Sequence, residues 1–146
     1  MTNNNENIEN TENTENTEQT ENVRMNDARR YICTVDNRTF EGKRAIVNAR
    51  NSAQSLNSYG EGKRLDVVGA YTAPAVRPQT GQPCTNVYLF TADGNTYFSQ
   101  SEGINRSILD IVDMFPDFNA GNGGIPVVVK STALGGGKSI KSLQIL

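Results

Sequence analysis

The chain has 146 residues, a net charge of −2 and no histidine or tryptophan, and this length is typical of one domain with additions at its ends. The lack of histidine excludes catalytic triads that contain it, and it removes the commonest general base and most zinc sites. Two cysteines, Cys33 and Cys84, cannot complete a zinc site by themselves. We therefore predict that the protein is not an enzyme and has no metal or other cofactor.

The N-terminal segment is strongly acidic and almost free of apolar residues. Glutamate recurs at every third position from residue 6 to residue 21, with Asn and Thr filling most of the gaps. Such a segment cannot bury enough apolar surface to offset the entropy lost on ordering. The sequence predicts a disordered acidic arm over residues 1–24 and a folded domain over residues 25–146.

Charge is divided unevenly between these two parts. Residues 1–22 hold six of the 16 acidic residues and none of the 14 basic ones, so residues 23–146 carry ten negative and 14 positive charges, about +4. A basic domain with an acidic arm suits a protein that binds a polyanion, although ordinary charge scatter is the alternative. The N-terminus lacks an apolar stretch typical of a signal peptide, and no apolar run reaches the ~20 residues of a membrane span. We expect no membrane association and two buried, free thiols.

Apolar alternation and turn residues predict the elements of the body in chain order. A helix is expected over residues 101–115, because its isoleucines follow helical spacing, Ser99 and Glu102 fit a capping box, and Pro116 ends it. Gly69 is a possible bulge. Strands are expected over residues 29–36, 43–50, 64–72, 85–92, 95–99, 125–132 and 139–146.

These elements predict a mainly β protein: a small antiparallel barrel, similar to an OB-fold, with one amphipathic helix before the last β-hairpin. A generic β-sandwich or an SH3-like barrel is the structural alternative. Asp93 and Gly94 are typical of a two-residue hairpin turn. That turn would place Phe90 opposite Tyr97, so that Tyr88, Phe90 and Tyr97 share one face of the hairpin. Val87, Leu89 and Phe98 would share the other.

Because both faces of this hairpin are apolar, one of them is free to bind a ligand. Aromatic rings on a strand face, with cations nearby, are how small barrels hold single-stranded nucleic acid, and DNA and RNA remain equally open here. The alternative is that the rings fill the core. The candidate rings are Tyr71, Tyr88, Phe90 and Tyr97, and the candidate cations are Lys43, Arg44, Arg50, Lys63, Arg64 and Arg77.

Several motifs resemble the single-stranded DNA-binding protein of protein-primed, short-tailed phages. They are "LDVVGAYTAPAV", "LFTADGNTYFSQS", "PVVVKSTALGGGKS" and the ending "SLQIL", and the resemblance covers about residues 40–146. In that family tyrosines stack on bases, and by position Tyr71 and Tyr97 look like two of them. A further family tyrosine would fall near Pro78, where this sequence departs from the pattern.

The resemblance implies a protein of the host cytoplasm that coats and protects the displaced strand during phage DNA replication, without sequence preference. Its expected partners are single-stranded DNA and, through the acidic arm, phage replication proteins, and we expect a monomer or weak oligomer. The alternative function is a non-enzymatic β-domain that serves as a protein-interaction adaptor or virion component.

Overall fold

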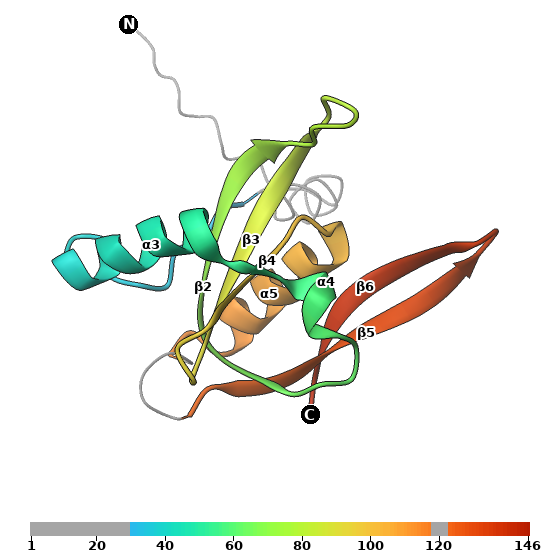
Figure 1. Cartoon of the computed structure of the whole chain (residues 1–146). Helices are drawn as coiled ribbons and strands as arrows, with labels where there is room; N and C mark the ends of the chain where they lie inside the picture. The colour runs from blue at the N-terminus through green and yellow to red at the C-terminus, as the bar shows by residue number, and fades with distance from the viewer. Residues whose placement is uncertain (1–29, 118–122) are drawn as a thin grey trace, which may run out of the picture. The chain divides into compact units, whose positions relative to one another are not determined.

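The computed structural model describes residues 30–117 and 123–146 (Figure 1). The predicted acidic arm, residues 1–24, lies outside them. The helices are α3 (Phe40–Ser52), α4 (Leu56–Tyr59) and α5 (Glu102–Met114). The strands are β1 (Gln54–Ser55), β2 (Leu65–Val76), β3 (Pro83–Thr91), β4 (Thr96–Ser99), β5 (Ile125–Gly135) and β6 (Lys138–Ile145).

One six-stranded sheet organises the described residues, with the strand order β1-β4-β3-β2-β5-β6. All neighbouring strands are antiparallel except β1 and β4, which are parallel. The sheet curls, and α5 precedes the final hairpin formed by β5 and β6 (Figure 1). This arrangement confirms the prediction of a mainly β, OB-like fold with an amphipathic helix before the last hairpin.

The strand predicted over residues 43–50 is wrong, because this segment belongs to helix α3. Thr39 caps the helix: its hydroxyl accepts a hydrogen bond from the Gly42 amide at 3.0 Å. Gly42 and Ala49 are buried, seven residues apart on one side of the helix. The apolar alternation around Ile46 is outweighed by this cap and by good helix formers such as Lys43.

The strand predicted over residues 29–36 forms only an isolated bridge within the part of the chain that is described. Cys33 is paired with Tyr71 in an antiparallel arrangement. Its side chain is exposed, so the prediction of two buried thiols is wrong for Cys33 and confirmed for Cys84. The Thr34 amide donates to the Ala70 carbonyl at 3.0 Å, and the Thr72 amide donates to the Ile32 carbonyl at 2.9 Å. A short extended segment therefore lies along β2 where β5 does not, because β5 pairs with β2 only at Leu65–Val67.

The turn between β3 and β4 is one residue longer than predicted. The Thr91 amide donates to the Asn95 carbonyl at 3.0 Å, which leaves a three-residue loop that ends at Gly94 with a φ of 90°. The side chain of Asp93 accepts hydrogen bonds from Thr91 Oγ1 at 2.6 Å and from the Asn95 amide at 3.1 Å. These bonds, the Thr91 hydroxyl above all, hold the pKa of Asp93 below its usual value.

This longer turn changes which side chains share a face. Tyr97 lies opposite Leu89, and Phe98 lies opposite Tyr88, whereas the two-residue turn would have paired Tyr97 with Phe90. A shift of one residue moves every side chain of a strand to the other face of the sheet. The prediction that Tyr88, Phe90 and Tyr97 share a face is therefore wrong for Tyr97, and Phe98 takes its place.

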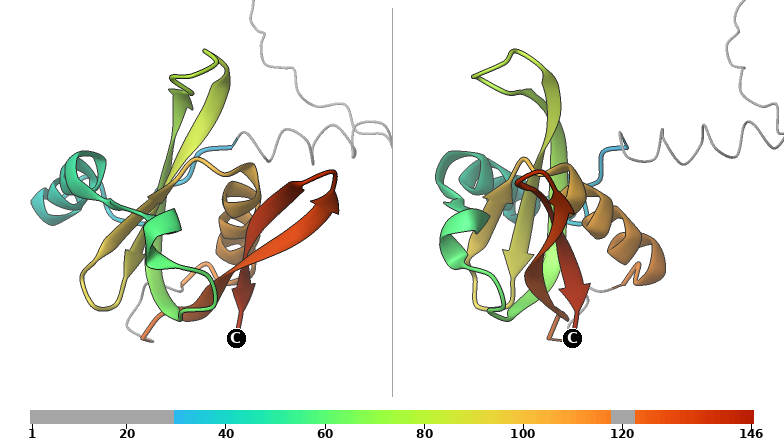
Figure 2. Two further views of the ribbon diagram at one scale, coloured as in Figure 1. Left: turned by 45° about the vertical axis from the view of Figure 1, so that its right-hand side comes forward. Right: turned by 90° about the vertical axis from the view of Figure 1, so that its right-hand side faces the viewer.

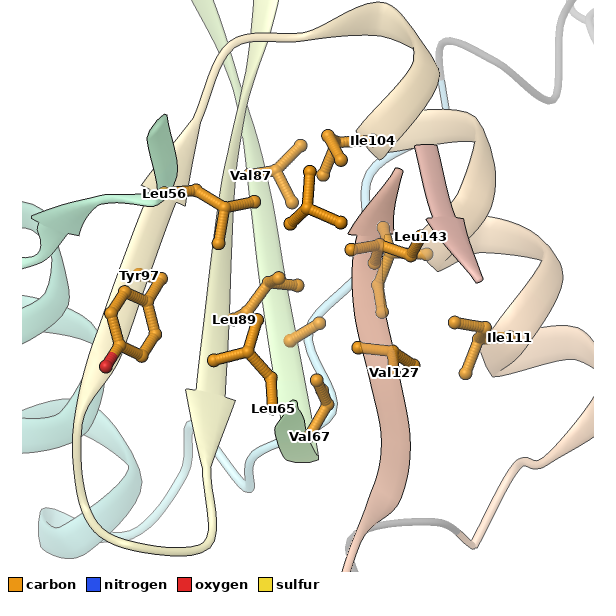
Figure 3. Close-up of a cluster of buried hydrophobic side chains, with 13 residues drawn as sticks. Leu56, Leu65, Val67, Val87, Leu89, Tyr97, Ile104, Ile111, Val127 and Leu143 are labelled. Atoms are coloured by element: carbon orange, nitrogen blue, oxygen red, sulfur yellow. The ribbon is translucent and has the colours of Figure 1, made fainter. Parts of the chain in front are cut away.

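Helix α5 packs on the face that carries Leu89 and Tyr97, and together they form the core (Figure 3). The helix begins after Ser101, whose hydroxyl accepts from the Ile104 amide at 3.3 Å, so the N-cap is two residues later than predicted. Helices α3 and α5 lie on opposite sides of the sheet formed by β2, β3 and β4 (Figure 2). The core members are Leu56, Leu65, Val67, Ala70, Val87, Leu89, Tyr97, Ile104, Ile108, Ile111, Val127, Val129 and Leu143.

Candidate nucleic-acid interface

Three aromatic rings lie side by side across neighbouring strands, on the face of the sheet opposite α5. Tyr71 on β2 is directly opposite Tyr88 on β3, which is directly opposite Phe98 on β4. The ring centroids of Tyr71 and Tyr88 are 5.7 Å apart and stacked, and those of Tyr88 and Phe98 are 5.4 Å apart. We call Tyr71, Tyr88 and Phe98 the aromatic row.

A change of register at Gly69 places Tyr71 in this row. The pairing of β2 with β3 shifts between Val67 and Gly69, which confirms the bulge predicted there. Without this shift, the alternation of β2 would put Tyr71 on the same side as the core residues Leu65 and Val67. The bulge thus turns a core position into one on the face of the sheet opposite α5.

The three rings differ in how much of their surface reaches solvent. Tyr88 is 6% exposed, whereas Tyr71 and Phe98 are only partly buried. Tyr71 and Phe98 therefore have ring surface available for a planar ligand. The buried ring of Tyr88 lies between them and packs against both. Phe90 is also partly buried. It lies on the same face two residues after Tyr88 on β3, where it pairs with Gly69 on β2 and Thr96 on β4.

Polar side chains connect the aromatic row to Arg77. The Arg77 guanidinium donates to the Gln100 carbonyl at 3.0 Å. The Gln100 amide donates to the Asn86 side-chain oxygen at 2.9 Å, and the Asn86 amide lies 3.5 Å from the Tyr88 hydroxyl. These contacts fix a cation and two side-chain amide groups beside the rings.

A cleft of about 590 Å³ adjoins the row at Phe98. Arg77 enters it from the loop between β2 and β3, and Lys141 enters it from β6. Lys141 Nζ also lies 3.4 Å from a carboxylate oxygen of Glu61, in an exposed ion pair. The complete lining is Ser55, Asn57, Arg77, Gln79, Phe98, Ser99, Gln100, Ser101, Glu102, Gly103, Ser139, Ile140 and Lys141.

Tyr97 lies in the core and not in the aromatic row. It is 4% exposed and lies among the buried side chains of the core (Figure 3). Its ring meets that of Tyr59 edge-on, with the two ring centroids 4.9 Å apart. A base therefore finds almost no free surface on this ring. A role for Tyr97 in base stacking stays a prediction of the family resemblance, and the geometry favours Tyr71 and Phe98 for that role.

Burial raises the pKa of the Tyr97 phenol, and the charge of Asp93 raises it further. An unfolded tyrosine titrates near pH ~10. Because folded Tyr97 keeps its proton above that pH, its contribution to stability is complete below pH ~10 and is lost as the pH rises through the folded pKa. We expect the free energy of unfolding to fall more steeply above pH ~10 in the wild type than in Tyr97→Phe. Alkaline titrations of tyrosinate absorbance and pH-dependent melting test this, and superimposable curves for the two proteins would contradict it.

The other predicted cations lie on α3 and in the segment between α4 and β2. Lys43 and Arg50 are exposed on α3 and form no ion pair among these residues. Arg44 is paired with Glu41 on the same helix, and Arg64 is paired with Asp66 at 2.9 Å. Lys63 lies over the Tyr59 ring, 5.7 Å from its centroid. Of the predicted cations, Arg77 alone lines the cleft beside the row.

The residues that sequence reasoning missed are Phe98, Asn86, Gln100 and Lys141. Phe98 follows directly from strand alternation once the loop from Ala92 to Gly94 has three residues. The others carry no local signal, because strands distant in sequence bring them together.

A family described as phage single-stranded DNA-binding protein matches residues 25–146. The chain belongs to this family. Comparisons with curated proteins and with solved structures give no match. Membership confirms the resemblance seen in the sequence and implies single-stranded DNA as a partner of this protein.

The family consists of DNA-binding proteins and not of enzymes, in agreement with the prediction from the sequence. Over residues 30–117 and 123–146, no group of three or more His, Cys, Asp or Glu side chains could hold a metal ion. None of the helices in these ranges is long and apolar enough to cross a membrane.

Proposed function

We propose that this protein coats single-stranded DNA without sequence preference and protects the strand displaced during phage DNA replication in the host cytoplasm. The observation that carries the proposal is the aromatic row, which continues at Phe98 into a cleft that holds Arg77 and Lys141. Rings beside cations match the two components of a DNA strand, which are flat bases and a charged backbone.

In the proposed complex, bases stack on the accessible rings of Tyr71 and Phe98. Each stacked base contributes roughly 1–3 kcal/mol, and every base has a flat face, so stacking does not select a sequence. Arg77 and Lys141 lie where they can contact phosphates and release bound counterions. Lys43 and Arg50, which are exposed on α3, are further candidates for phosphate contacts.

The proposal is tested by titrating the full chain with poly-dT while intrinsic tyrosine fluorescence is followed at several salt concentrations. We expect saturable quenching, because bases stack on Tyr71, and a steep loss of affinity with salt. The slope of the logarithm of the binding constant against the logarithm of the salt concentration becomes more negative by about 0.7 for each phosphate contact with a single strand. Duplex DNA and a random-sequence strand serve as controls for strand preference and sequence preference. If poly-dT causes neither quenching nor a mobility shift, the aromatic row is instead a protein-docking face, as in the adaptor alternative.

The acidic arm and the oligomeric state remain predictions. We propose that residues 1–24 form a disordered acidic arm that contacts phage replication proteins, since they carry six glutamates and Arg24 as their one basic residue. Deleting residues 1–24 should remove this contact and leave poly-dT binding in place. Light scattering of the full chain would show whether it is a monomer or weak oligomer.

A further inference from the structure

The edge of β2 that faces away from β3 is shared by two different neighbours. Strand β5 pairs with it at Leu65–Val67, and the extended segment around Cys33 lies along it at Ala70–Thr72. This segment comes from the N-terminal side of α3 and adds a further extended chain beside the strands that carry the aromatic row. Its exposed side chains therefore lie next to the proposed DNA-binding face.

Core packing and strand pairing show which side chains of this segment point to which face, and hydrogen bonds hold the segment against β2. The Ile32 amide donates to Thr72 Oγ1 at 2.8 Å, and the Ala70 amide donates to Thr34 Oγ1 at 2.9 Å. Ile32 packs against the core, on the α5 side. Cys33 is instead paired with Tyr71 and so lies on the side of the aromatic row. The alternation of an extended chain places Tyr31 on the same side as Cys33.

Exposure increases along this face toward the segment. Tyr88 is 6% exposed and Tyr71 is partly buried, whereas Cys33 is exposed and Tyr31 is 49% exposed. Tyr31 is not among the side chains that form or pack against the core. A half-exposed tyrosine ring beside a row of stacked rings is available to a planar ligand, and its hydroxyl can stay hydrated.

We propose that Tyr31 is a further base-stacking residue, which extends the aromatic row across the edge of β2 to one more nucleotide of the bound strand. This inference rests on the proposed function, because the ligand is the same single-stranded DNA. It makes the strand cross β4, β3 and β2 in turn and end against the segment that carries Cys33. A bound strand that stops at Tyr71 is the competing outcome of the tests below.

The first test uses Cys33 as a footprint of the DNA path. The full chain is alkylated with a maleimide in the presence and absence of saturating poly-dT, and the labelled peptides are quantified by mass spectrometry. We expect DNA to slow alkylation of Cys33 several-fold, because the thiol is exposed and paired with Tyr71. Cys84 is buried and serves as an internal control for unfolding. Alkylation of Cys33 at the same rate with and without DNA would overturn the proposal.

The second test measures affinity for a fluorescein-labelled dT oligonucleotide by anisotropy. We expect Tyr31→Leu to bind about tenfold more weakly, and Tyr31→Phe, which keeps the ring, to bind as the wild type does. Phe115→Leu is the matched control, since Phe115 is 41% exposed at the end of α5, on the other side of the sheet. Thermal melting verifies that Tyr31→Leu is folded.

The inference requires both the protection of Cys33 and the weaker binding of Tyr31→Leu. The outcomes below distinguish its failure from failure of the proposed function. If Tyr31→Leu binds as tightly as the wild type while Tyr71→Leu binds weakly, the bound strand stops at Tyr71 and does not reach Tyr31. That outcome overturns the inference and leaves the proposed function in place. If the wild type itself fails to bind the oligonucleotide, both proposals are overturned.

Discussion

Replacing Tyr71 by leucine weakens binding to a dT oligonucleotide about tenfold to a hundredfold, whereas Tyr71→Phe binds as the wild type does. The reason is the loss of one base-stacking surface, worth roughly 1–3 kcal/mol. Leucine keeps apolar bulk against Tyr88, whose ring centroid is 5.7 Å from that of Tyr71, so the fold is retained. Anisotropy titrations at a fixed salt concentration measure the change.

A comparison with Tyr97 sharpens this prediction, since the family resemblance indicates both tyrosines. Tyr97→Leu removes a ring that is 4% exposed and packs against Tyr59, so we expect a lower melting temperature and an affinity close to wild type. The titration is done well below the melting temperature of the variant, and Phe115→Leu is the exposed aromatic control. If folded Tyr97→Leu loses as much affinity as Tyr71→Leu, our assignment of the stacking face is wrong.

Gly103→Ala destabilises the protein by about 1–3 kcal/mol, although alanine is the better helix former. Helix propensity alone predicts a gain of about 1 kcal/mol. However, a Cβ at Gly103 would lie 1.9 Å from the Lys141 carbonyl oxygen and 3.0 Å from Ile140 Cγ1. A backbone oxygen cannot rotate away, so α5 must move from β6, and such overpacking costs more than the propensity gain. Urea denaturation measures the free energy of unfolding.

The matched control is Asp110→Ala, at an exposed position of the same helix, which we expect to be neutral or slightly stabilising. Ser107→Ala is a second probe of the same contact, because Ser107 Oγ accepts from the Leu143 amide at 3.0 Å. We expect it to destabilise by about 1 kcal/mol. A stabilising Gly103→Ala would show that α5 does not approach β6 this closely. Since Gly103 lines the cleft, the displaced helix should also weaken DNA binding.

Local patterns in the sequence were sufficient where short-range physics decides the structure. Helix α5 was predicted because isoleucines at helical spacing form one apolar side and Pro116 follows the helix. The bulge at Gly69 and the hairpin turn at Gly94 were predicted because glycine accepts backbone geometry that other residues avoid. These elements were enough to predict the OB-like class.

Local patterns failed where two structures fit the same residues. The segment around Ile46 alternates like a strand, but the Thr39 cap and the burial of Ala49 favour a helix. The turn residues Asp93 and Gly94 suit loops of two or three residues. The one-residue difference in loop length decides whether Tyr97 or Phe98 shares a face of the sheet with Tyr88.

The sequence by itself determined the fold class and the family, and it predicted Tyr71 as a base-stacking residue. Only the tertiary structure decided which rings lie beside Tyr71 on its face of the sheet. Tyr97 is in the core because its ring packs against Tyr59, and the cleft exists because Arg77 and Lys141 lie on two different hairpins. Such contacts join residues far apart in the chain, and the periodicity of a single strand or helix carries no information about them.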